Sequence, residues 1–170
     1  MLAPHCIYSS ERFEAGPYQD PVAPVLMPNP IKNILSDLKF NHLGLAVRDD
    51  REGLIMVEAL GYELGNRFYD PLQNVFVRLC IAPGRPTVEI VQPGDKGKSP
   101  IDSIISKYNE LIYHTCYETP DLKRTLQGIE QVGLRLMTLS ERTPAVLFGG
   151  RHVSFYKVFG WGIIELLERN

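Results

Sequence analysis

The sequence has little cysteine, no long hydrophobic run and almost no excess charge of either sign. Its three cysteines, Cys6, Cys80 and Cys116, are odd in number and share no spacing typical of a metal site. We therefore expect a reduced protein of the cytoplasm. No apolar run approaches the roughly 18 residues that cross a bilayer, and no charged stretch followed by an apolar one predicts a secretory signal. The formal net charge of −2 offers no basic surface for nucleic acid. We expect neither a membrane nor a nucleic acid as a partner.

The composition is that of an ordinary globular protein. The 170 residues are 44% hydrophobic and 22% charged, which suits one domain or two small halves that share an interface. Residues 1–38 differ from the rest, because they are rich in proline and show no clear period. We expect an extended N-terminal arm there. His5 lies in this arm, and we expect it to take no part in a functional site.

An internal repeat is the strongest structural signal in the chain. Aligning the segment that begins at Phe40 with the segment that begins at Ile112 places His42 on His114, an offset of 114 − 42 = 72. A fixed-period match over this length indicates a duplicated supersecondary unit rather than a solenoid. The other pairs matched at this offset are Asp49 and Asp121, Leu54 and Leu126, Glu58 and Glu130, Gly61 and Gly133, and Leu64 and Leu136.

Each copy of the repeat predicts a strand, a helix and three further strands. We divide the chain into the arm (1–38), a first β-α-β-β-β module (39–97), a linker helix (98–110) and a second module (111–170). The first strands are expected at 40–47 and 112–118. The later strands are expected at 62–66, 75–81 and 86–92 in the first module, and at 134–138, 152–157 and 161–167 in the second.

Helix ends can also be predicted from the sequence. Gly61 and Gly133 sit where a glycine commonly ends a helix. Thr119 is the expected N-cap of the second module's helix, because Pro120 follows at the first helical position. Ser99 is the expected cap of the linker helix on the same grounds.

The strand FNHLGLAV places a histidine in an unusual setting. Alternate residues of a strand share a face, so His42 lies with Gly44 and Ala46, which leave open space around the ring. This is a poor way to fill a core and a good way to line a cavity. In the equivalent strand, Cys116 shares the face of His114. We expect Tyr113 and Tyr117 to face away.

Two glutamates occupy the last strands of the modules. Glu89 lies within PTVEIVQP and Glu165 within GIIELLE, at an offset of 165 − 89 = 76. Burying an unpaired carboxylate among Ile, Val and Leu is unfavourable by several kcal/mol, at about the level of a lost ion pair. Such a carboxylate requires a cation or a position open to water.

Together these residues predict a metal site. A lone histidine in a strand is more often structural and a lone glutamate more often solvated. Here His42, Glu89, His114 and Glu165 fall at equivalent places of a duplicated unit, which favours convergence on one divalent ion. Nitrogen and oxygen ligands suit Fe, Co, Ni, Mn or Zn. Four protein ligands leave two positions of a six-coordinate ion free.

The residues match a known superfamily. The paired modules with His…Glu…His…Glu resemble the vicinal oxygen chelate superfamily, which includes glyoxalases, extradiol dioxygenases and methylmalonyl-CoA epimerase. The segments NHLGLAV, VEIVQP with KSPIDSII, YHTCYET and GWGIIELLE are most similar to the epimerase branch. The resemblance covers about residues 39–168. It implies an α+β fold in which the two modules form a half-open, curved mixed β-sheet with helices on the outside.

The resemblance also implies roles for residues. It makes His42, Glu89, His114 and Glu165 the metal ligands. Where the epimerases have an acidic pair with a glutamine and a glycine, this chain reads DPLQNV, so that Gln73 is retained and only Asp70 is a nearby acid. Near the final turn, Tyr156 and Lys157 stand where the family tends to have His-Pro.

The leading hypothesis is a metal-dependent isomerase or epimerase of a 2-substituted acyl thioester, acting through a metal-stabilised enolate. Glu165 is the preferred proton-transfer group, ahead of Asp70, and Glu89 is a further candidate. A CoA or other carrier phosphate would meet basic side chains, and we expect a homodimer. The candidate substrate-binding residues are Gln73, Ser99, Cys116, Arg151 and His152, with Lys96 and Lys98 as further phosphate contacts.

Three alternatives stay open on sequence alone. One is a glyoxalase-type lyase. Another is an Fe(II) dioxygenase, whose iron is held by two histidines and one carboxylate. The fourth protein ligand argues against this alternative. The last is a metal-free protein of the same fold that binds a small molecule such as a drug. The substrate, the metal, the role of the arm, and whether the modules pair within one chain or between two chains are also left open.

Overall fold

The structure is a computed structural model that describes residues 33–169. The predicted arm, with His5 and Cys6, therefore lies outside the described residues except for residues 33–38. These form a turn in which the backbone N–H of Ser36 donates to the carbonyl of Asn33, and that of Leu38 to the carbonyl of Leu35.

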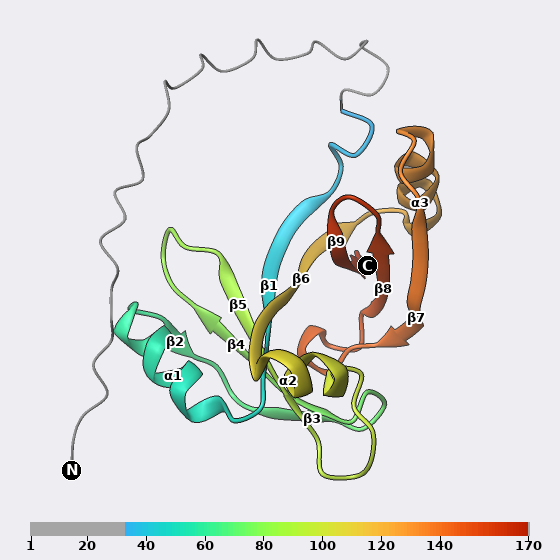
Figure 1. The fold of residues 1–170 in the computed structure, drawn as a ribbon. Helices are drawn as coiled ribbons and strands as arrows, with labels where there is room; N and C mark the ends of the chain where they lie inside the picture. Colours follow the sequence, from blue (N-terminus) through green and yellow to red (C-terminus); the bar gives the residue numbers. More distant parts are fainter. Residues whose placement is uncertain (1–32, 170) are drawn as a thin grey trace, which may run out of the picture.

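The described residues form an open, mixed sheet of nine strands with three α-helices (Figure 1). The strand order is β2-β4-β5-β1-β6-β9-β8-β7, with the short β3 paired to β4. This confirms the predicted α+β fold of the vicinal oxygen chelate type. The elements are β1 (Lys39–Val47), α1 (Asp50–Ala59), β2 (Glu63–Leu64), β3 (Phe68–Asp70), β4 (Val75–Ile81), β5 (Thr87–Pro93), α2 (Asp102–Tyr108), β6 (Glu110–Thr119), α3 (Leu122–Gln131), β7 (Leu136–Pro144), the 3-10 helix η1 (Val146–Phe148), β8 (His152–Val158) and β9 (Gly162–Glu168).

The two halves of the sheet meet where β1 pairs with β6. This central pairing is antiparallel, whereas β1 with β5 and β6 with β9 are parallel. The strand that carries each histidine therefore lies beside the strand that carries the glutamate of its own half. Because β1 and β6 belong to one chain, the halves pair within the chain.

The helices α1 and α3 begin and terminate at equivalent residues of the two halves. Asp49 caps α1 and Asp121 caps α3, and each side chain accepts a backbone N–H from the first turn. Gly61 and Gly133 follow these helices with φ of 82° and 81°, the left-handed conformation that favours glycine. The prediction of Thr119 as N-cap was wrong by two residues, because the Thr119 side chain is buried and bonds to Thr125 instead.

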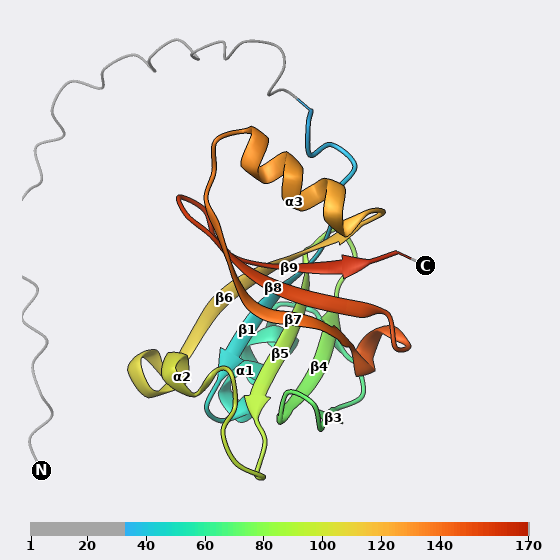
Figure 2. The ribbon, with the colours of Figure 1, turned by 90° about the vertical axis from the view of Figure 1, so that its right-hand side faces the viewer.

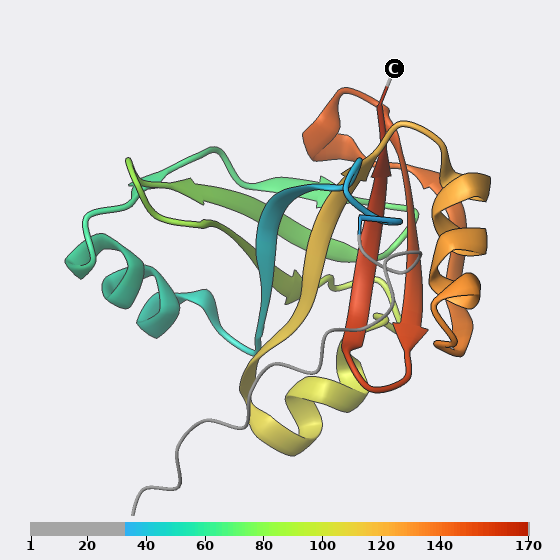
Figure 3. The ribbon, with the colours of Figure 1, turned by 90° about the horizontal axis from the view of Figure 1, so that it is seen from above.

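The face of the sheet opposite His42 is covered by α1 and α3, which Figure 3 shows at opposite ends of the sheet. In the first half, Val57 of α1 packs on Val47, Cys80 and Ile90. In the second half, α3 contributes Ile129, which packs with Tyr156, Val158, Ile164 and Leu166. This outer face follows the strand alternation expected from the sequence.

The face that carries His42, here called the inner face, is closed by two other segments, seen from the side in Figure 2. Ile105 of α2, with Ile101 just before it, packs on Ala46, Val75, Val77 and Val91. Ala145 and the partly buried Phe148 of the η1 segment pack with Cys116, Val153 and Leu167. Apolar side chains thus cover the two ends of the inner face and leave its middle for other residues.

The linker helix is shorter than predicted. It begins at Asp102 with Ile101 as N-cap, and Ser99 closes the preceding turn instead. The Ser99 backbone N–H donates to the Asp102 carboxylate (2.8 Å), and the Ser99 hydroxyl accepts from the backbone N–H of Ile101 (3.4 Å).

The described part of the chain contains no helix long and apolar enough to cross a membrane.

Candidate metal centre

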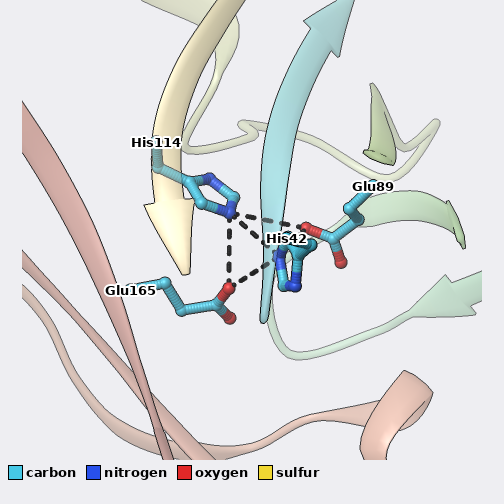
Figure 4. Close-up of side chains that lie close together, drawn as sticks. All are labelled: His42, Glu89, His114 and Glu165. Atoms are coloured by element: carbon cyan, nitrogen blue, oxygen red, sulfur yellow. Dashed lines mark hydrogen bonds and ion pairs between the residues drawn. The ribbon is translucent and has the colours of Figure 1, made fainter. Parts of the chain in front are cut away.

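Four buried side chains meet in the middle of the inner face. His42 comes from β1, Glu89 from β5, His114 from β6 and Glu165 from β9, which are the four central strands of the sheet. Their exposed fractions lie between 0% and 7%. Figure 4 shows the two imidazoles and two carboxylates pointing toward one another. These are the four residues predicted to converge.

The facing atoms are closely spaced. The Nε2 atoms of His42 and His114 are 3.2 Å apart. Oε2 of Glu165 lies 3.0 Å from Nε2 of His42 and 3.3 Å from Nε2 of His114. Oε2 of Glu89 lies 3.3 Å and 3.7 Å from the same two nitrogens. One donor atom from each residue lies within 4.8 Å of every other.

The register of β1 and β6 brings the two rings together. His42 lies opposite Cys116, and His114 lies opposite Gly44. Each histidine therefore faces a small residue that follows the other histidine by two positions in its strand. A Cβ on Gly44 would overlap the His114 ring atoms. The space left beside His42 by Gly44 is therefore occupied by the second imidazole.

Each histidine is preceded by a β-bulge. Asn41 is the extra residue of β1 between the pairs Phe40–Tyr117 and His42–Cys116, and Tyr113 is the extra residue of β6 between Gly44–His114 and Leu45–Ile112. A bulge rotates a side chain out of strict alternation. Tyr113 lines the cavity beside the centre, so the prediction that it faces away was wrong. Tyr117 packs on the outer face with α3, as predicted.

Without a metal, the pKa values of His42 and Glu165 are shifted from their ordinary values. Burial alone would lower the pKa of His42, but hydrogen bonds and charge interactions with Glu165 and Glu89 raise this pKa to about 10. Burial would raise the pKa of Glu165, but the close contacts of its carboxylate with the His114 and His42 imidazoles bring this pKa below the ordinary value. A buried cation, here the His42 imidazolium, is what stabilises the carboxylates.

The residues fit a divalent metal ion. Two carboxylates and two neutral imidazoles balance a charge of +2, whereas one imidazolium leaves a buried excess of negative charge. Ligands at about 2.0–2.2 Å from one ion stand about 3 Å apart in neighbouring positions, and the five measured separations run from 3.0 to 3.7 Å. Oε2 of Glu165 is also buried without a hydrogen-bond partner of good geometry among the described residues. These four buried residues could therefore hold a metal.

Aromatic rings surround the two imidazoles. Phe148 of η1 stacks on His42, with ring centroids 5.7 Å apart and planes 13° apart. The His114 ring makes T-shaped contacts with Tyr113 and Phe155, with ring centroids 4.4 Å and 5.4 Å apart. These contacts exclude water and restrict the rotation of both rings.

A small cavity of about 20 Å³ adjoins the centre, which is room for about one water molecule. Asp70 and Gln73 line it as well as Glu89 and Glu165. Oδ1 of Asp70 accepts the backbone N–H groups of Leu72 (2.9 Å) and Gln73 (3.2 Å). The remaining lining residues are Val75, Val77, Val91, Tyr113, Ala145, Val146, Leu147, Phe148 and Phe155.

The other candidate residues do not line this cavity. Cys116 is fully buried opposite His42, and burial, together with the Glu165 carboxylate, raises the pKa of its thiol. Arg151 donates to the Glu118 carboxylate (2.9 Å) and to the carbonyl of Glu168 (2.9 Å). His152 lies half-buried opposite Pro144 in β8, and Ser99 lies in the turn before α2.

Comparison with known proteins agrees with this geometry. The family model described as the glyoxalase/bleomycin resistance protein/dioxygenase superfamily matches residues 41–155, more than half of the chain. No curated protein matches the sequence.

Solved structures share the fold at low sequence identity. A hypothetical protein from Bacillus halodurans C-125 is 23% identical with a TM-score of 0.63, over 78% of this chain and 95% of that one. Methylmalonyl-CoA epimerase from Mycobacterium tuberculosis is 21% identical with a TM-score of 0.62, over 77% and 87%. A Streptomyces coelicolor methylmalonyl-CoA epimerase variant in complex with 2-nitronate-propionyl-CoA is 18% identical with a TM-score of 0.58, over 76% and 96%. The chain belongs to the glyoxalase/bleomycin resistance protein/dioxygenase superfamily.

Proposed function

We propose that the protein is a metal-dependent isomerase or epimerase that moves a proton next to the carbonyl of an acyl thioester. The observation that carries this proposal is the cavity lined both by Glu89 and Glu165 of the centre and by Asp70, a carboxylate that is not one of the four. Structures of the same fold include epimerases in complex with methylmalonyl-CoA or a propionyl-CoA analogue.

His42, Glu89, His114 and Glu165 would hold one divalent ion. When bound, the ion supplies Lewis acidity toward a carbonyl oxygen, which makes the neighbouring C–H bond more acidic. If the ion accepts six ligands, these four residues would leave room for one or two substrate oxygens. The buried, aromatic surroundings lower the local dielectric and strengthen this interaction.

Asp70 is the group that we assign to proton abstraction. Glu165, the group preferred on sequence alone, is one of the four residues that would hold the ion, whereas the Asp70 carboxylate lies outside those four and lines the same cavity. Asp70 is buried and held in place by two backbone N–H groups on Oδ1, and Gln73 Nε2 approaches Oδ2 at 3.4 Å. The proton taken from carbon would move to Oδ2.

Epimerisation also requires a proton donor on the opposite side of the substrate. Tyr113, which lines the cavity together with Asp70, is the candidate donor. Burial, and then the charges of Glu89 and Glu165, raise the pKa of Tyr113 well above its usual range, so its hydroxyl stays protonated. It can therefore donate a hydrogen bond to a substrate oxygen or return a proton to carbon.

Substrate access requires movement of the η1 segment. A cavity of about 20 Å³ is far smaller than an acyl group, and Val146, Leu147 and Phe148 form part of its wall. Only the acyl end would enter, and the carrier would remain outside. The Asn74 side chain, next to Gln73, donates hydrogen bonds to the carbonyls of Gly97 and Lys98. The loop that carries Lys96 and Lys98 therefore lies at the Gln73 end of the cavity. These lysines could bind the phosphate of a carrier there.

The test combines metal analysis with solvent exchange. Metal-loaded protein is incubated in deuterium oxide with a panel of 2-substituted acyl thioesters, and deuterium at the α-carbon is measured. We expect incorporation with at least one substrate, its loss in Asp70→Asn, and its loss after chelation. Incorporation that persists in Asp70→Asn would transfer the role of base to Glu165.

Absence of exchange across the panel would contradict the proposal and favour a lyase or an oxygenase. Glu89→Gln separates these two, because a dioxygenase needs only two histidines and one carboxylate. A protein that takes up no metal would instead be a metal-free binding protein of the same fold.

A further inference from the structure

The side of His42 that faces away from the centre is held by a chain of hydrogen bonds. Its Nδ1 lies 2.8 Å from Oδ1 of Asn41, and Nδ2 of Asn41 donates to Oε1 of Glu118 at 3.2 Å. Nη1 of Arg151 donates to the same Oε1 at 2.9 Å, and Nε of Arg151 donates to the carbonyl of Glu168 at 2.9 Å. We propose that Asn41 is a positioning residue that, held by Glu118 and Arg151, fixes the His42 ring so that Nε2 faces the metal.

The direction of each hydrogen bond follows from the groups involved. A carboxylate only accepts, so the amide nitrogen of Asn41 must face Glu118 and its amide oxygen must face His42. That oxygen also only accepts, so Nδ1 of His42 must carry a hydrogen. Nε2 is then the ring nitrogen whose lone pair is free for a metal ion.

The β-bulge makes this contact possible. In a regular strand Asn41 would point to the face opposite its neighbour His42. The extra residue between the pairs Phe40–Tyr117 and His42–Cys116 turns the Asn41 side chain back toward the ring that follows it. Glu118, on the neighbouring strand β6, is within reach of the same side chain.

His114 has no comparable partner. Its Nδ1 is buried and makes no hydrogen bond among the described residues, so the side of the ring away from the centre is held only by packing against Tyr113 and Phe155. His42 is therefore the ligand whose orientation is set before a metal arrives. Outer hydrogen bonds to a ligating histidine are typically worth about 10- to 100-fold in metal affinity.

This inference rests on the metal centre of the proposed function, and the experiment keeps the two apart. Dissociation constants for Zn²⁺ and Co²⁺ are measured by chelator competition for the wild type, Asn41→Leu and Thr115→Val. Asn41→Leu keeps the branched shape of the side chain and removes both hydrogen bonds. Thr115→Val is the matched control, because the Thr115 hydroxyl is buried beside His114 without a partner among the described residues.

We expect Asn41→Leu to weaken metal binding by about 10- to 100-fold and Thr115→Val to change it less than twofold. The second readout is the long-range proton–nitrogen NMR spectrum of the zinc-loaded protein. The wild type should show His42 ligated through Nε2 with Nδ1 protonated, and Asn41→Leu should lose this single pattern. A purely structural role would lower the melting temperature and leave both the affinity and the pattern unchanged.

If Asn41→Leu does not fold, Glu118→Gln provides the second variant. It keeps an acceptor for Asn41 but removes the charge that holds Arg151. We expect about a three- to tenfold loss of affinity, which is smaller than the typical 10- to 100-fold because the acceptor remains. Wild-type affinity in the folded variants would overturn the positioning role while the metal centre stands. A wild type that binds neither metal would overturn both.

Discussion

His42 and His114 occupy equivalent places in the two halves of the molecule, yet their rings are held by different means. His42 is fixed by a hydrogen bond from its Nδ1 to Asn41 and by the stacked ring of Phe148. His114 lies opposite Gly44 and makes T-shaped contacts with Tyr113 and Phe155. A duplicated unit therefore keeps the ligands in register, while the supports around each ligand differ between the halves.

The largest effect is expected from Gly44→Ala, which acts on the half held by packing. The new methyl group would overlap the His114 ring, and Nδ1 of that ring has no hydrogen bond among the described residues that could guide it to a new position. We expect metal affinity to fall by about 10- to 100-fold, as for loss of a ligand's support, and the protein to lose about 1–3 kcal/mol from overpacking. Chelator competition and thermal unfolding measure these.

The control for this variant is Gly53→Ala. Gly53 lies in α1, and a Cβ there would make ordinary contact with Val47 at 3.7 Å. This change should leave metal affinity unchanged and stabilise the helix by up to about 1 kcal/mol. Wild-type affinity in Gly44→Ala would show that His114 is not held by this contact.

A smaller effect is expected from Phe148→Ala, which removes the stacked ring from His42. Phe148 is half-buried, so truncation should cost about 2 kcal/mol, below the range for a fully buried phenylalanine. The Asn41 hydrogen bond remains, so metal affinity should fall by less than about tenfold, while metal exchange should become faster because the centre is less covered. Stopped-flow transfer of metal to a chelator measures the rate, and an unchanged rate would show that η1 does not limit access.

The pH dependence of metal binding should report the protonation of His42. In the metal-free protein the pKa of His42 is about 10, so below that pH an ion must displace one proton. Metal affinity should therefore rise about tenfold per pH unit between pH 7 and 9 and then level off. Calorimetry in buffers of different ionisation enthalpy measures the protons released.

The same group affects the stability of the metal-free protein. Its folded pKa lies above the unfolded value near 6.5, so its contribution is complete below about pH 6.5 and is lost as the pH rises toward 10. His152→Asn, which changes a histidine outside the centre, should leave the pH dependence of metal affinity unchanged. A metal affinity that does not vary between pH 7 and 9 would contradict the assignment.

The smallest effect is expected at the two helix caps, where the halves are alike. Asp49 accepts the backbone N–H of Arg51 at 3.0 Å, and Asp121 accepts that of Arg124 at 2.9 Å. Replacing either with alanine should lower the free energy of unfolding by about 1 kcal/mol without changing metal affinity. Denaturant unfolding of both variants would show whether the caps are equivalent, and a loss more than twice as large in one would show that they are not.

Much of the centre could be predicted because the repeat fixes register. The offset between His42 and His114 identifies the facing pair, and the two glutamates stand out as charges within apolar strands. The face alternation of β1 was also predictable, since Leu45 and Val47 pack on the outer face as expected.

The two β-bulges could not be predicted from the alternation of apolar and polar residues along the strands. A one-residue insertion reverses which face a side chain takes, so Asn41 and Tyr113 were missed as neighbours of the centre. One signal was present, because 41 + 72 = 113 and both residues directly precede a repeated histidine. The cover over the centre was also missed, since nothing in the loop from 139 to 151 indicates that Phe148 packs on an imidazole.

The measurement that tests the central claim most directly is the number of metal ions bound per chain. Protein stripped with chelator, reloaded with Co²⁺ or Zn²⁺ and passed through a desalting column should retain one ion per chain, and the double variant His114→Ala with Glu165→Ala should retain none. A wild type that retains no ion, or a double variant that binds as tightly as the wild type, would contradict the convergence of these four side chains on one metal.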